Sequence, residues 1–233
     1  LVGLIGPNGA GKTTVFNMLS GIYTPTEGEI SFWDRNGHIH LVGRKQPAQL
    51  NKLGISRTFQ NIRLFNNLTV EDNVRIALHA HRMINPIDVL LRTPRFTQDE
   101  KLMSEKTAQL LSLFKIDSKL QELAKNLPYG EQRKLEIVRA LAARPSLLLL
   151  DEPAAGMNPQ ETDELMKLIA FVRKEFNVTI LLIEHDMHLV MGICERLIVL
   201  DYGKIIAEGN PQDVRKDPVV IKAYLGEEAV INA

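Results

Sequence analysis

A glycine-rich turn between an apolar strand and a helix constrains the fold of this chain more than any other feature. The pattern G-x-x-x-x-G-K-[ST] is matched by Gly6-Pro7-Asn8-Gly9-Ala10-Gly11-Lys12-Thr13. An apolar run, 1–5, precedes the turn, and a helix is predicted over 12–20, with Gly21 as its stop. Glycines let consecutive backbone N–H groups point at one anion, and a helix N-terminus adds its positive end. The turn therefore predicts a phosphate-binding loop.

The side chains of this loop suit a nucleotide such as ATP. Lys12 is expected to reach the β- and γ-phosphates, and the Thr13 hydroxyl is expected to bind Mg²⁺. Thr14 adds a second hydroxyl near the α-phosphate. A chance glycine-rich turn is the alternative interpretation. The strand before the turn and the helix after it argue against that alternative.

Two carboxylates end a second apolar run. Residues 147–150 are all leucine, and Asp151 and Glu152 follow them. Because a buried parallel strand delivers its last residues to the ligand-binding edge of a sheet, both side chains are expected beside the phosphate loop. Asp151 would hold Mg²⁺, directly or through water, and Glu152 would orient and deprotonate an attacking water. Solvated acids at a strand end are the common alternative, which the neighbouring phosphate loop disfavours.

Composition excludes several classes of protein. The chain has 233 residues, a formal net charge of zero, and ordinary apolar (45%) and charged (24%) fractions. These values argue against disorder, and a neutral chain has no general attraction for nucleic acid or an anionic membrane surface. The single cysteine, Cys194, allows no intrachain disulfide and is expected to be a small buried apolar group. No apolar run approaches the about eighteen residues of a membrane-spanning helix.

Apolar periodicity predicts strands that alternate with helices. Strands are predicted at 29–32, 147–150 and 178–183, and a hairpin at 197–200 and 204–207. Between 69 and 143 the pattern is helical, with Pro86 and Pro94 as breaks, and the segment 36–54 allows no assignment. The residues predicted to form apolar helix faces are Leu102, Met103, Leu110, Leu111 and Phe114; Leu135, Val138, Leu141 and Ala142; and Leu165, Leu168, Ile169, Val172 and Phe176.

These patterns predict an α/β fold: a P-loop NTPase core with a mostly parallel sheet flanked by helices, into which an α-helical subdomain is inserted. We expect a single domain. Residues 1–66 and 144–225 would form the core lobe, 67–143 the helical subdomain and 226–233 a loose tail. Because the chain opens with Leu1 inside a predicted core strand, we expect the natural protein to have residues upstream.

A segment shortly before the acidic strand makes a family likeness specific. Residues 127–133 read Leu-Pro-Tyr-Gly-Glu-Gln-Arg, and with the phosphate loop and the acidic pair they resemble the ATP-binding-cassette (ABC) ATPases, whose signature is Leu-Ser-Gly-Gly-Gln. Gln60 resembles the Gln loop of that family, 155–159 the loop that crosses to a partner subunit, and His185 the switch histidine. The resemblance covers essentially the whole chain. It implies an ABC ATPase fold and Mg²⁺-dependent ATP hydrolysis coupled to transport.

Five segments narrow the resemblance. They are 55–70 (ISRTFQNIRLFNNLTV), 91–96 (LRTPRF), 154–159 (AAGMNP), 183–191 (IEHDMHLVM) and 220–226 (VIKAYLG). Each is similar to the ATPase subunits of branched-chain amino-acid importers. This likeness implies uptake of branched-chain, hydrophobic amino acids through a separate membrane permease. The ATPase of a related lipid or lipopolysaccharide exporter is the alternative within transport.

The resemblance also implies roles for single residues. In such ATPases two cassettes meet head to tail and enclose two ATP molecules. Gln60 would contact Mg²⁺ or the attacking water, and His185 would hydrogen-bond the γ-phosphate and help place Glu152. The implied catalytic residues are Glu152, His185 and Gln60, and the implied Mg²⁺ ligands are Thr13, Gln60 and Asp151.

The signature would close the ATP site of the partner cassette through Tyr129, Gly130 and Glu131. It departs from the family pattern, because Pro128 stands in place of Ser, Tyr129 in place of Gly and Glu131 in place of Gln. The loss of one charge-assisted hydrogen bond would cost about 1.5–3 kcal/mol of closure if water does not replace it. In the crossing loop, Asn158 replaces the usual Asp. The family stacks adenine on an aromatic residue upstream of this chain, so no residue here is assigned that role.

The resemblance implies partners and a location. We expect a second ABC cassette, which would be a different paralogous subunit, transmembrane permease subunits and, indirectly, a substrate-binding protein, but no nucleic acid. Leu64 and Phe65 are expected to belong to a groove that takes a permease helix. The chain would then lie at the cytoplasmic face of the membrane. Two other hypotheses stay open: a cassette outside transport, and a regulatory subunit that closes a site without hydrolysing ATP.

Overall fold

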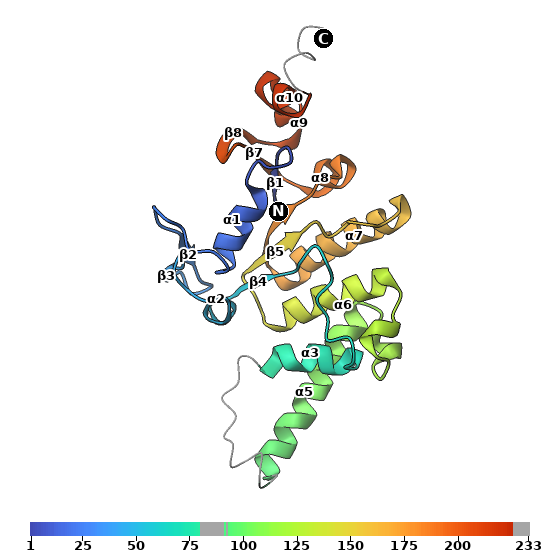
Figure 1. Ribbon diagram of the computed structural model, residues 1–233. Coiled ribbons are helices and arrows are strands. Elements are labelled where there is room, and N and C mark those ends of the chain that lie inside the picture. The colour runs from blue at the N-terminus through green and yellow to red at the C-terminus, as the bar shows by residue number, and fades with distance from the viewer. Residues whose placement is uncertain (80–90, 92, 226–233) are drawn as a thin grey trace. The chain divides into compact units, whose positions relative to one another are not determined.

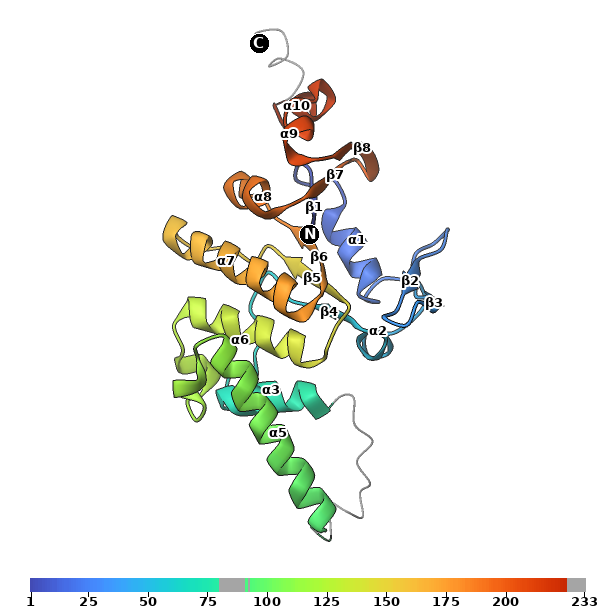
Figure 2. The ribbon, with the colours of Figure 1, turned by 180° about the vertical axis from the view of Figure 1, so that it is seen from behind.

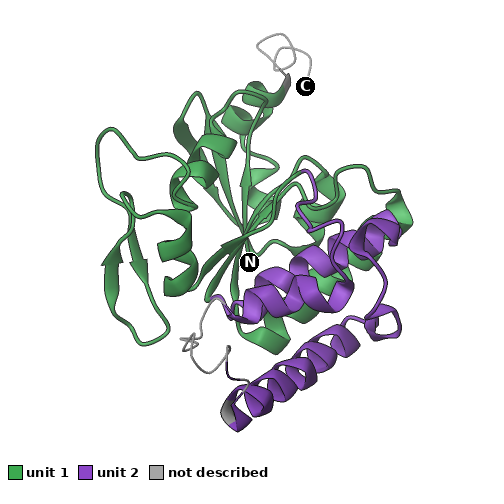
Figure 3. Ribbon diagram, turned by 60° about the horizontal axis from the view of Figure 1, so that its bottom comes forward, with its two compact units in different colours: residues 1–60, 146–233 green, residues 61–145 purple. Residues whose placement is uncertain are grey.

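The computed structural model describes residues 1–79, 91 and 93–225. They fall into two compact units (Figure 3). Unit 1 combines Leu1–Gln60 with Ser146–Ala233, and unit 2 is Asn61–Pro145. The expected break at Pro86 and the expected tail at 226–233 lie outside the described residues.

Unit 1 is built on a six-stranded sheet with the strand order β4-β5-β6-β1-β7-β8 (Figure 1). All neighbouring strands are parallel except β7 and β8, which form the antiparallel hairpin expected from the sequence. The strands are β1 (Val2–Ile5), β4 (Ile55–Arg57), β5 (Leu147–Asp151), β6 (Thr179–Ile183), β7 (Arg196–Asp201) and β8 (Lys204–Gly209). The mostly parallel sheet predicted from the sequence is confirmed.

Helices cover both faces of this sheet, as Figures 1 and 2 show from opposite sides. The helix α1 (Lys12–Leu19) lies on one face, and α7 (Pro159–Phe176) and α8 (Met187–Ile193) lie on the other. The last described elements are α9 (Pro211–Val214) and α10 (Pro218–Leu225). The core between α1 and the sheet is formed by Leu4, Ala10, Phe16, Val42, Leu50, Ile55, Leu149, Ile183 and Leu200. A buried apolar side chain contributes about 1.5–3 kcal/mol, so this layer holds the glycine-rich loop in place.

The segment left unassigned from the sequence contains regular structure. An antiparallel pair is formed by β2 (Ser31–Trp33), which was expected at 29–32, and β3 (Ile39–Leu41). The helix α2 (Pro47–Leu53) follows, with Pro47 in its first turn and Gly54 at φ 101° after its end. Its first turn is closed by the Gln46 N–H, which donates to Gln49 Oε1 at 3.0 Å. Each strand is three residues long, too short for a periodic signal.

Unit 2 is helical, as expected. Among its described residues, the helices are α3 (Val70–His79), α5 (Pro94–Leu113) and α6 (Tyr129–Ala142), with short 3₁₀ turns at Asp117–Lys119 and Ala124–Asn126. Pro94 begins α5 behind the cap residue Thr93, whose hydroxyl accepts from the Phe96 N–H. The expected apolar face of α5 is wrong at Leu102, which is 40% exposed, because the buried stripe runs through Met103 and Leu111.

The boundary between the units lies at 60/61 and 145/146, whereas the sequence placed it at 66/67 and 143/144. The segment after Gln60 is joined to α3 by one buried side chain, Asn73. The Phe65 N–H donates to Asn73 Oδ1 at 2.9 Å, and Asn73 Nδ2 donates to the Phe65 carbonyl at 3.1 Å. These hydrogen bonds make residues 61–66 part of the helical unit. No local sequence pattern predicts them.

Two expectations about chemistry outside the site can be compared with the structure. Cys194 is 7% exposed, and burial raises the pKa of its thiol to about 12, so it is the inert apolar group expected. Among the described residues, no helix combines the length and the apolar character that crossing a bilayer requires.

Candidate functional site

Four neighbouring parallel strands of unit 1 carry the chemistry-bearing residues at one edge of the sheet. In sheet order, β4 leads to Gln60, β5 ends at Asp151 and is followed by Glu152, β6 leads to His185, and β1 leads to the glycine-rich loop. Because parallel strands end at the same edge, four segments that lie far apart in the sequence converge there. This edge is the candidate active site.

The glycine-rich loop is held by the β7–β8 hairpin. The Gly203 N–H donates to the Ala10 carbonyl at 2.9 Å. At Gly6, with φ 151°, an added Cβ would lie 2.1 Å from the Leu200 carbonyl oxygen, so only glycine fits. Gly11 is the left-handed residue, with φ 102°, from which α1 begins. The loop therefore reaches the helix N-terminus in a conformation that substitution at these two glycines would disrupt.

Lys12 folds back over this loop. Its Nζ donates to the carbonyl oxygens of Gly6 at 2.8 Å and Pro7 at 3.0 Å, and the residue is 6% exposed. Burial lowers the pKa of this ammonium group, and the negative charge of Glu152 acts in the opposite direction. Thr13 and Thr14, the next residues of α1, are exposed. The loop thus presents one ammonium group, two hydroxyls and the first N–H groups of a helix to a single region.

The carboxylate of Glu152 contacts two side chains, one at each oxygen. Gln60 Nε2 donates to Glu152 Oε2 at 2.7 Å, and His185 Nε2 lies 3.1 Å from Glu152 Oε1. The backbone of Glu152 has φ 45°, a left-handed conformation that costs a non-glycine residue about 1–3 kcal/mol. It is fixed there by its N–H, which donates to the Ile183 carbonyl at 2.9 Å. The structure thus brings Gln60, Glu152 and His185 together, with the carboxylate in the middle.

Asp151, the last residue of β5, is 6% exposed. Its Oδ2 accepts a hydrogen bond of 2.6 Å from Nη2 of Arg57, the last residue of β4. No sequence motif indicates a role for Arg57 at this site. The two residues are 94 positions apart in the chain, and only the pairing of β4 with β5 places them together.

Glu184 is a second site residue that no sequence motif indicates. It is 4% exposed, and burial raises the pKa of its carboxyl group, while N–H donors oppose that shift. Those donors are the N–H groups of Ala154 at 2.7 Å, His185 at 3.0 Å and Asp186 at 3.4 Å. One buried carboxylate therefore joins the loop after β5 to the loop that carries His185. Its position directly after an apolar run was the only sequence signal.

The loop after β5 ends in a helix cap. Asn158 Oδ1 accepts from the Glu161 N–H at 3.0 Å, and Glu161 Oε2 accepts from the Asn158 N–H at 2.9 Å. This reciprocal arrangement is a capping box for α7. Since an Asp side chain caps a helix in the same way, the Asn that departs from the family pattern keeps the local structure.

The donor set fits a divalent cation of the magnesium type. Asp151 and Thr13 supply hard oxygen atoms, and Mg²⁺ in proteins is commonly bound by one or two carboxylates together with substrate phosphates. Within the described residues, no three or more His, Cys, Asp or Glu side chains are grouped so that they could hold a metal ion by themselves. A cation here would therefore depend on phosphate oxygens from a bound nucleotide.

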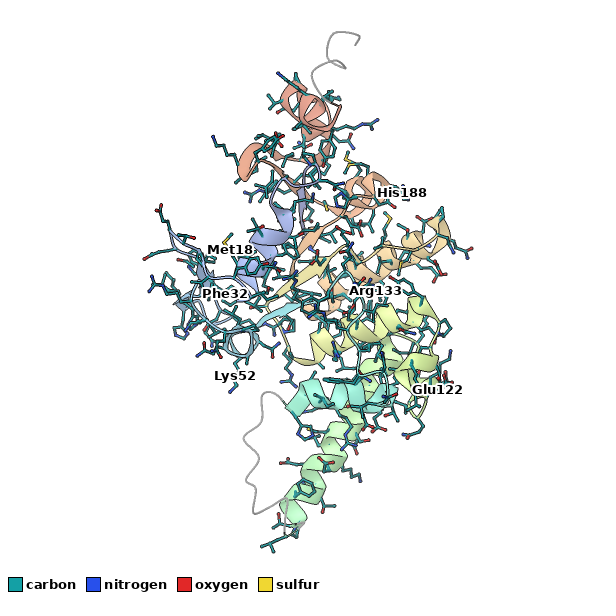
Figure 4. The ribbon with its side chains drawn as sticks, viewed as in Figure 1. Met18, Phe32, Lys52, Glu122, Arg133 and His188 are labelled. Carbon is teal, nitrogen blue, oxygen red and sulfur yellow. The ribbon has the colours of Figure 1, made fainter. Side chains whose placement is uncertain are left out.

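In unit 2, the signature segment forms the first turn of α6. Pro128 is the residue before the helix, and its side chain makes no capping hydrogen bond. Tyr129 is 42% exposed, and its hydroxyl accepts from Arg133 Nη2 at 3.2 Å (Arg133 is labelled in Figure 4). Glu131 forms an ion pair with Lys119, with N–O distances of 2.7 and 2.9 Å. A Cβ added at Gly130 would meet no atom within 4 Å.

Known protein families match this chain in two regions. The family described as ABC transporter matches residues 1–155, and the family described as branched-chain amino acid ATP-binding cassette transporter matches residues 204–230. The chain is 47% identical over 227 residues to the high-affinity branched-chain amino acid transport ATP-binding protein LivG of Salmonella typhimurium, and 48% identical over 227 residues to BraF of Pseudomonas aeruginosa, which has the same description. Each alignment covers 97% of this chain and 87% of the relative.

A solved structure agrees with these sequence matches. The crystal structure of the ADP conformation of an ATP-binding cassette of an ABC transporter superposes with a TM-score of 0.79 at 30% identity. It covers 97% of this chain, which in turn covers 88% of that cassette. The fold, the matched family and the close relatives agree, and the chain belongs to the ABC transporter family as one of its ATP-binding, ATP-hydrolysing subunits.

Proposed function

We propose that this chain binds ATP with Mg²⁺ at the 6–14 loop, hydrolyses it with Glu152 as the general base, and powers uptake of branched-chain amino acids through a separate permease. The observation that carries the catalytic part is the Glu152 carboxylate, which lies between Gln60 at 2.7 Å and His185 at 3.1 Å. The observation that carries the transport part is the match of residues 204–230 to the branched-chain amino acid cassette family.

Nucleotide binding is assigned to the loop and the start of α1. The backbone N–H groups of Gly6, Asn8 and Gly11 would surround the β-phosphate, and the N-terminus of α1 would add its positive end. Lys12 now donates to two loop carbonyls, and its Nζ would turn toward the β- and γ-phosphates. The Thr14 hydroxyl would contact the α-phosphate. These residues orient the triphosphate with the bond to be broken facing the end of β5.

A bound Mg²⁺ would supply charge stabilisation between the β- and γ-phosphates. Thr13 and Asp151 would hold it, directly or through water, and Gln60 would contact it or the attacking water. Asp151 is suited to this because its side chain lies at a strand end and its Oδ2 is already fixed by Arg57. The residues present therefore fit a cation that arrives with the nucleotide.

Glu152 is assigned the proton transfer. A water oxygen attacks the γ-phosphorus, the bond from that phosphorus to the β–γ bridging oxygen breaks, and ADP leaves with the bonding electrons. Glu152 accepts the proton that the water gives up. Gln60 and His185 keep the carboxylate in position from either side, and the imidazole of His185 would turn to hydrogen-bond the γ-phosphate once nucleotide is bound.

Closure of the site is assigned to a second cassette in a head-to-tail dimer, which we propose to be a different paralogous subunit. This chain would offer the first turn of α6, with Tyr129, Gly130 and Glu131, to the partner's nucleotide. Glu131 replaces an uncharged residue of the family pattern, but its charge is paired with Lys119. The pair removes much of the repulsion that a carboxylate would exert on a phosphate.

Substitution of Gly130 by Ala is expected to separate folding from catalysis. The added methyl meets nothing within 4 Å, and Ala is a better helix former than Gly by up to about 1 kcal/mol, so thermal stability should stay equal or rise. If Gly130 closes on a partner's γ-phosphate, the methyl blocks that approach, and kcat should fall about 100- to 1,000-fold. Melting temperature and phosphate release, measured on the same sample, check this. Glu105→Ala on the exposed side of α5 is the control, and full turnover in Gly130→Ala would contradict the assigned closure.

A permease is the proposed membrane partner. Phe65, in the segment after Gln60, is 48% exposed, and the Arg139 guanidinium lies 5.4 Å from the centre of its ring. An exposed aromatic ring backed by a cation suits a groove for a partner helix. We propose that this contact holds the chain at the cytoplasmic face of the membrane, where a substrate-binding protein acts on it indirectly through the permease.

Reconstitution tests the transport assignment. The full-length subunit, its partner cassette and the permease are placed in liposomes, and phosphate release is followed with Mg²⁺ and ATP. We expect the leucine-loaded binding protein to stimulate hydrolysis. Stimulation by lipopolysaccharide instead of leucine would identify an exporter, and nucleotide binding without any hydrolysis would identify a regulatory subunit. Either result would overturn the proposed importer function.

A further inference from the structure

The guanidinium group of Arg57 connects three elements of unit 1. On one side, Nη2 donates to Asp151 Oδ2 on β5 at 2.6 Å. On the other, Nη1 donates to Asn17 Oδ1 and to Ser20 Oγ, both at 2.8 Å, near the end of α1. Arg57 itself ends β4. One side chain thus ties the helix that follows the phosphate loop to the carboxylate at the end of β5.

The position of this group is fixed by packing as well. Its Cζ lies 5.6 Å from the ring centre of Phe16 and 5.0 Å from that of Phe59. The side chains of Arg57 and Asp151 are only 7% and 8% exposed. A guanidinium is a rigid planar fork, so the two neighbouring rings and the hydrogen bonds at Nη1 and Nη2 leave it one orientation. Phe59 directly precedes Gln60, so the segment that carries Gln60 is attached to this cluster of side chains.

Asp151 therefore depends on Arg57 for its orientation. Oδ2 accepts from Arg57, and within the part of the chain that the structure describes Oδ1 has no hydrogen-bond partner. Rotation of the carboxylate would break a short, buried, charge-assisted bond. Oδ1 is left for a ligand.

We propose that Arg57 is a positioning residue for the cation-binding carboxylate: it holds Oδ2 of Asp151 so that Oδ1 is oriented for a divalent cation that arrives with the nucleotide. This inference rests on the proposed function, in which Asp151 holds Mg²⁺. Arg57 does not touch substrate or cation in this role. Partners that orient a metal ligand typically change metal affinity about 10- to 100-fold when they are removed.

A simple brace between α1 and the sheet is the competing explanation. A brace would affect thermal stability but not the cation dependence of nucleotide binding. A variant without the positive charge of Arg57 would give an ambiguous result. The guanidinium lies 2.6 Å from the Asp151 carboxylate and repels Mg²⁺, so its removal would strengthen Mg²⁺ binding while the loss of orientation would weaken it. The informative variants therefore keep both charges and alter only geometry.

Two such variants are available. Arg57→Lys keeps the charge and removes the planar fork, and the double variant Asn17→Ala with Ser20→Ala removes both acceptors of Nη1 while leaving the ion pair intact. Asn51→Ala is the matched control, because Asn51 Nδ2 donates to Ser56 Oγ at 3.1 Å and so joins another helix to β4 without touching Arg57. Asp151→Asn removes the carboxylate itself.

The measurement is the affinity of fluorescent ADP at a series of free Mg²⁺ concentrations. For Arg57→Lys, we expect the concentration that gives half of the Mg²⁺ effect to rise about 10- to 100-fold, with the Mg²⁺-free affinity unchanged. The Asn17 and Ser20 double variant should move the same way by a smaller factor, and Asn51→Ala should match the wild type. If both charge-keeping variants match the wild type while Asp151→Asn loses the Mg²⁺ effect, Arg57 is only a brace. If Asp151→Asn keeps the full Mg²⁺ effect, the cation site of the proposed function is wrong.

Discussion

Glu152→Gln is expected to bind ATP with nearly wild-type affinity and to hydrolyse it about 100 to 10,000 times more slowly. Glutamine has the size of glutamate but cannot accept the proton from the attacking water. The other contacts survive in part, because a glutamine side chain can still accept the hydrogen bond from Gln60 Nε2 that Glu152 Oε2 accepts at 2.7 Å. Phosphate release and binding of a fluorescent ATP analogue, measured in parallel, separate the two effects.

The same variant tests how the cassette closes. With turnover blocked, Mg²⁺ and ATP should hold this chain and the proposed partner cassette together in a closed sandwich, which light scattering detects as a shift from monomer to dimer. Dimer formation by this chain alone would show that Pro128 allows closure, and a monomer that binds ATP would point to a different paralogous cassette. Glu208→Gln, an exposed substitution on β8 away from the loop ends, should leave the rate unchanged. Wild-type turnover in Glu152→Gln would remove Glu152 from the role of base.

The sheet edge could be predicted from sequence because its residues follow the ends of apolar runs. The loop after β1 and the pair after 147–150 each stand directly behind such a run, whereas Gln60 and His185 were expected at the site from the family resemblance. Parallel strands then converge by a general rule, without any knowledge of distant contacts. The hairpin at Tyr202 and Gly203 could also be predicted from local sequence, because a short turn with a glycine separates two apolar runs. In the structure both residues take positive φ angles, 44° and 76°.

What the sequence did not reveal depends on tertiary contacts or on very short elements. Arg57 meets Asp151 only because β4 pairs with β5, and Glu184 meets Ala154 across 30 positions of the chain. The helix α2 did carry local signals, a Pro at its start and Gly54 after its end, but its seven residues bury only Leu50 and so gave no apolar stripe. Asn73 fixes residues 61–66 to α3 by hydrogen bonds that no periodicity encodes.

Lys12→Ala is expected to leave the fold intact and to weaken ATP binding about 10- to 150-fold, the loss that follows when a hydrogen bond worth about 1.5–3 kcal/mol to a charged group is removed. The ammonium group is buried in the loop, where burial lowers its pKa, and its present acceptors are two backbone carbonyls. Bound phosphate would replace those acceptors and restore the full benefit of the charge. Alanine removes that gain but leaves no unpaired buried charge behind.

Thermal stabilisation by nucleotide measures this loss without relying on turnover. ATP at about 100 times its Kd should stabilise the wild type by about 2.7 kcal/mol, and at the same concentration Lys12→Ala should gain only about 0.3–1.4 kcal/mol. Lys52→Ala at the exposed end of α2 (Lys52 is labelled in Figure 4) is the control and should respond like the wild type. An equal shift in Lys12→Ala would mean that the ammonium group makes no phosphate contact. The nucleotide would then be held by the backbone N–H groups of the loop alone, and the assigned role of Lys12 would be wrong.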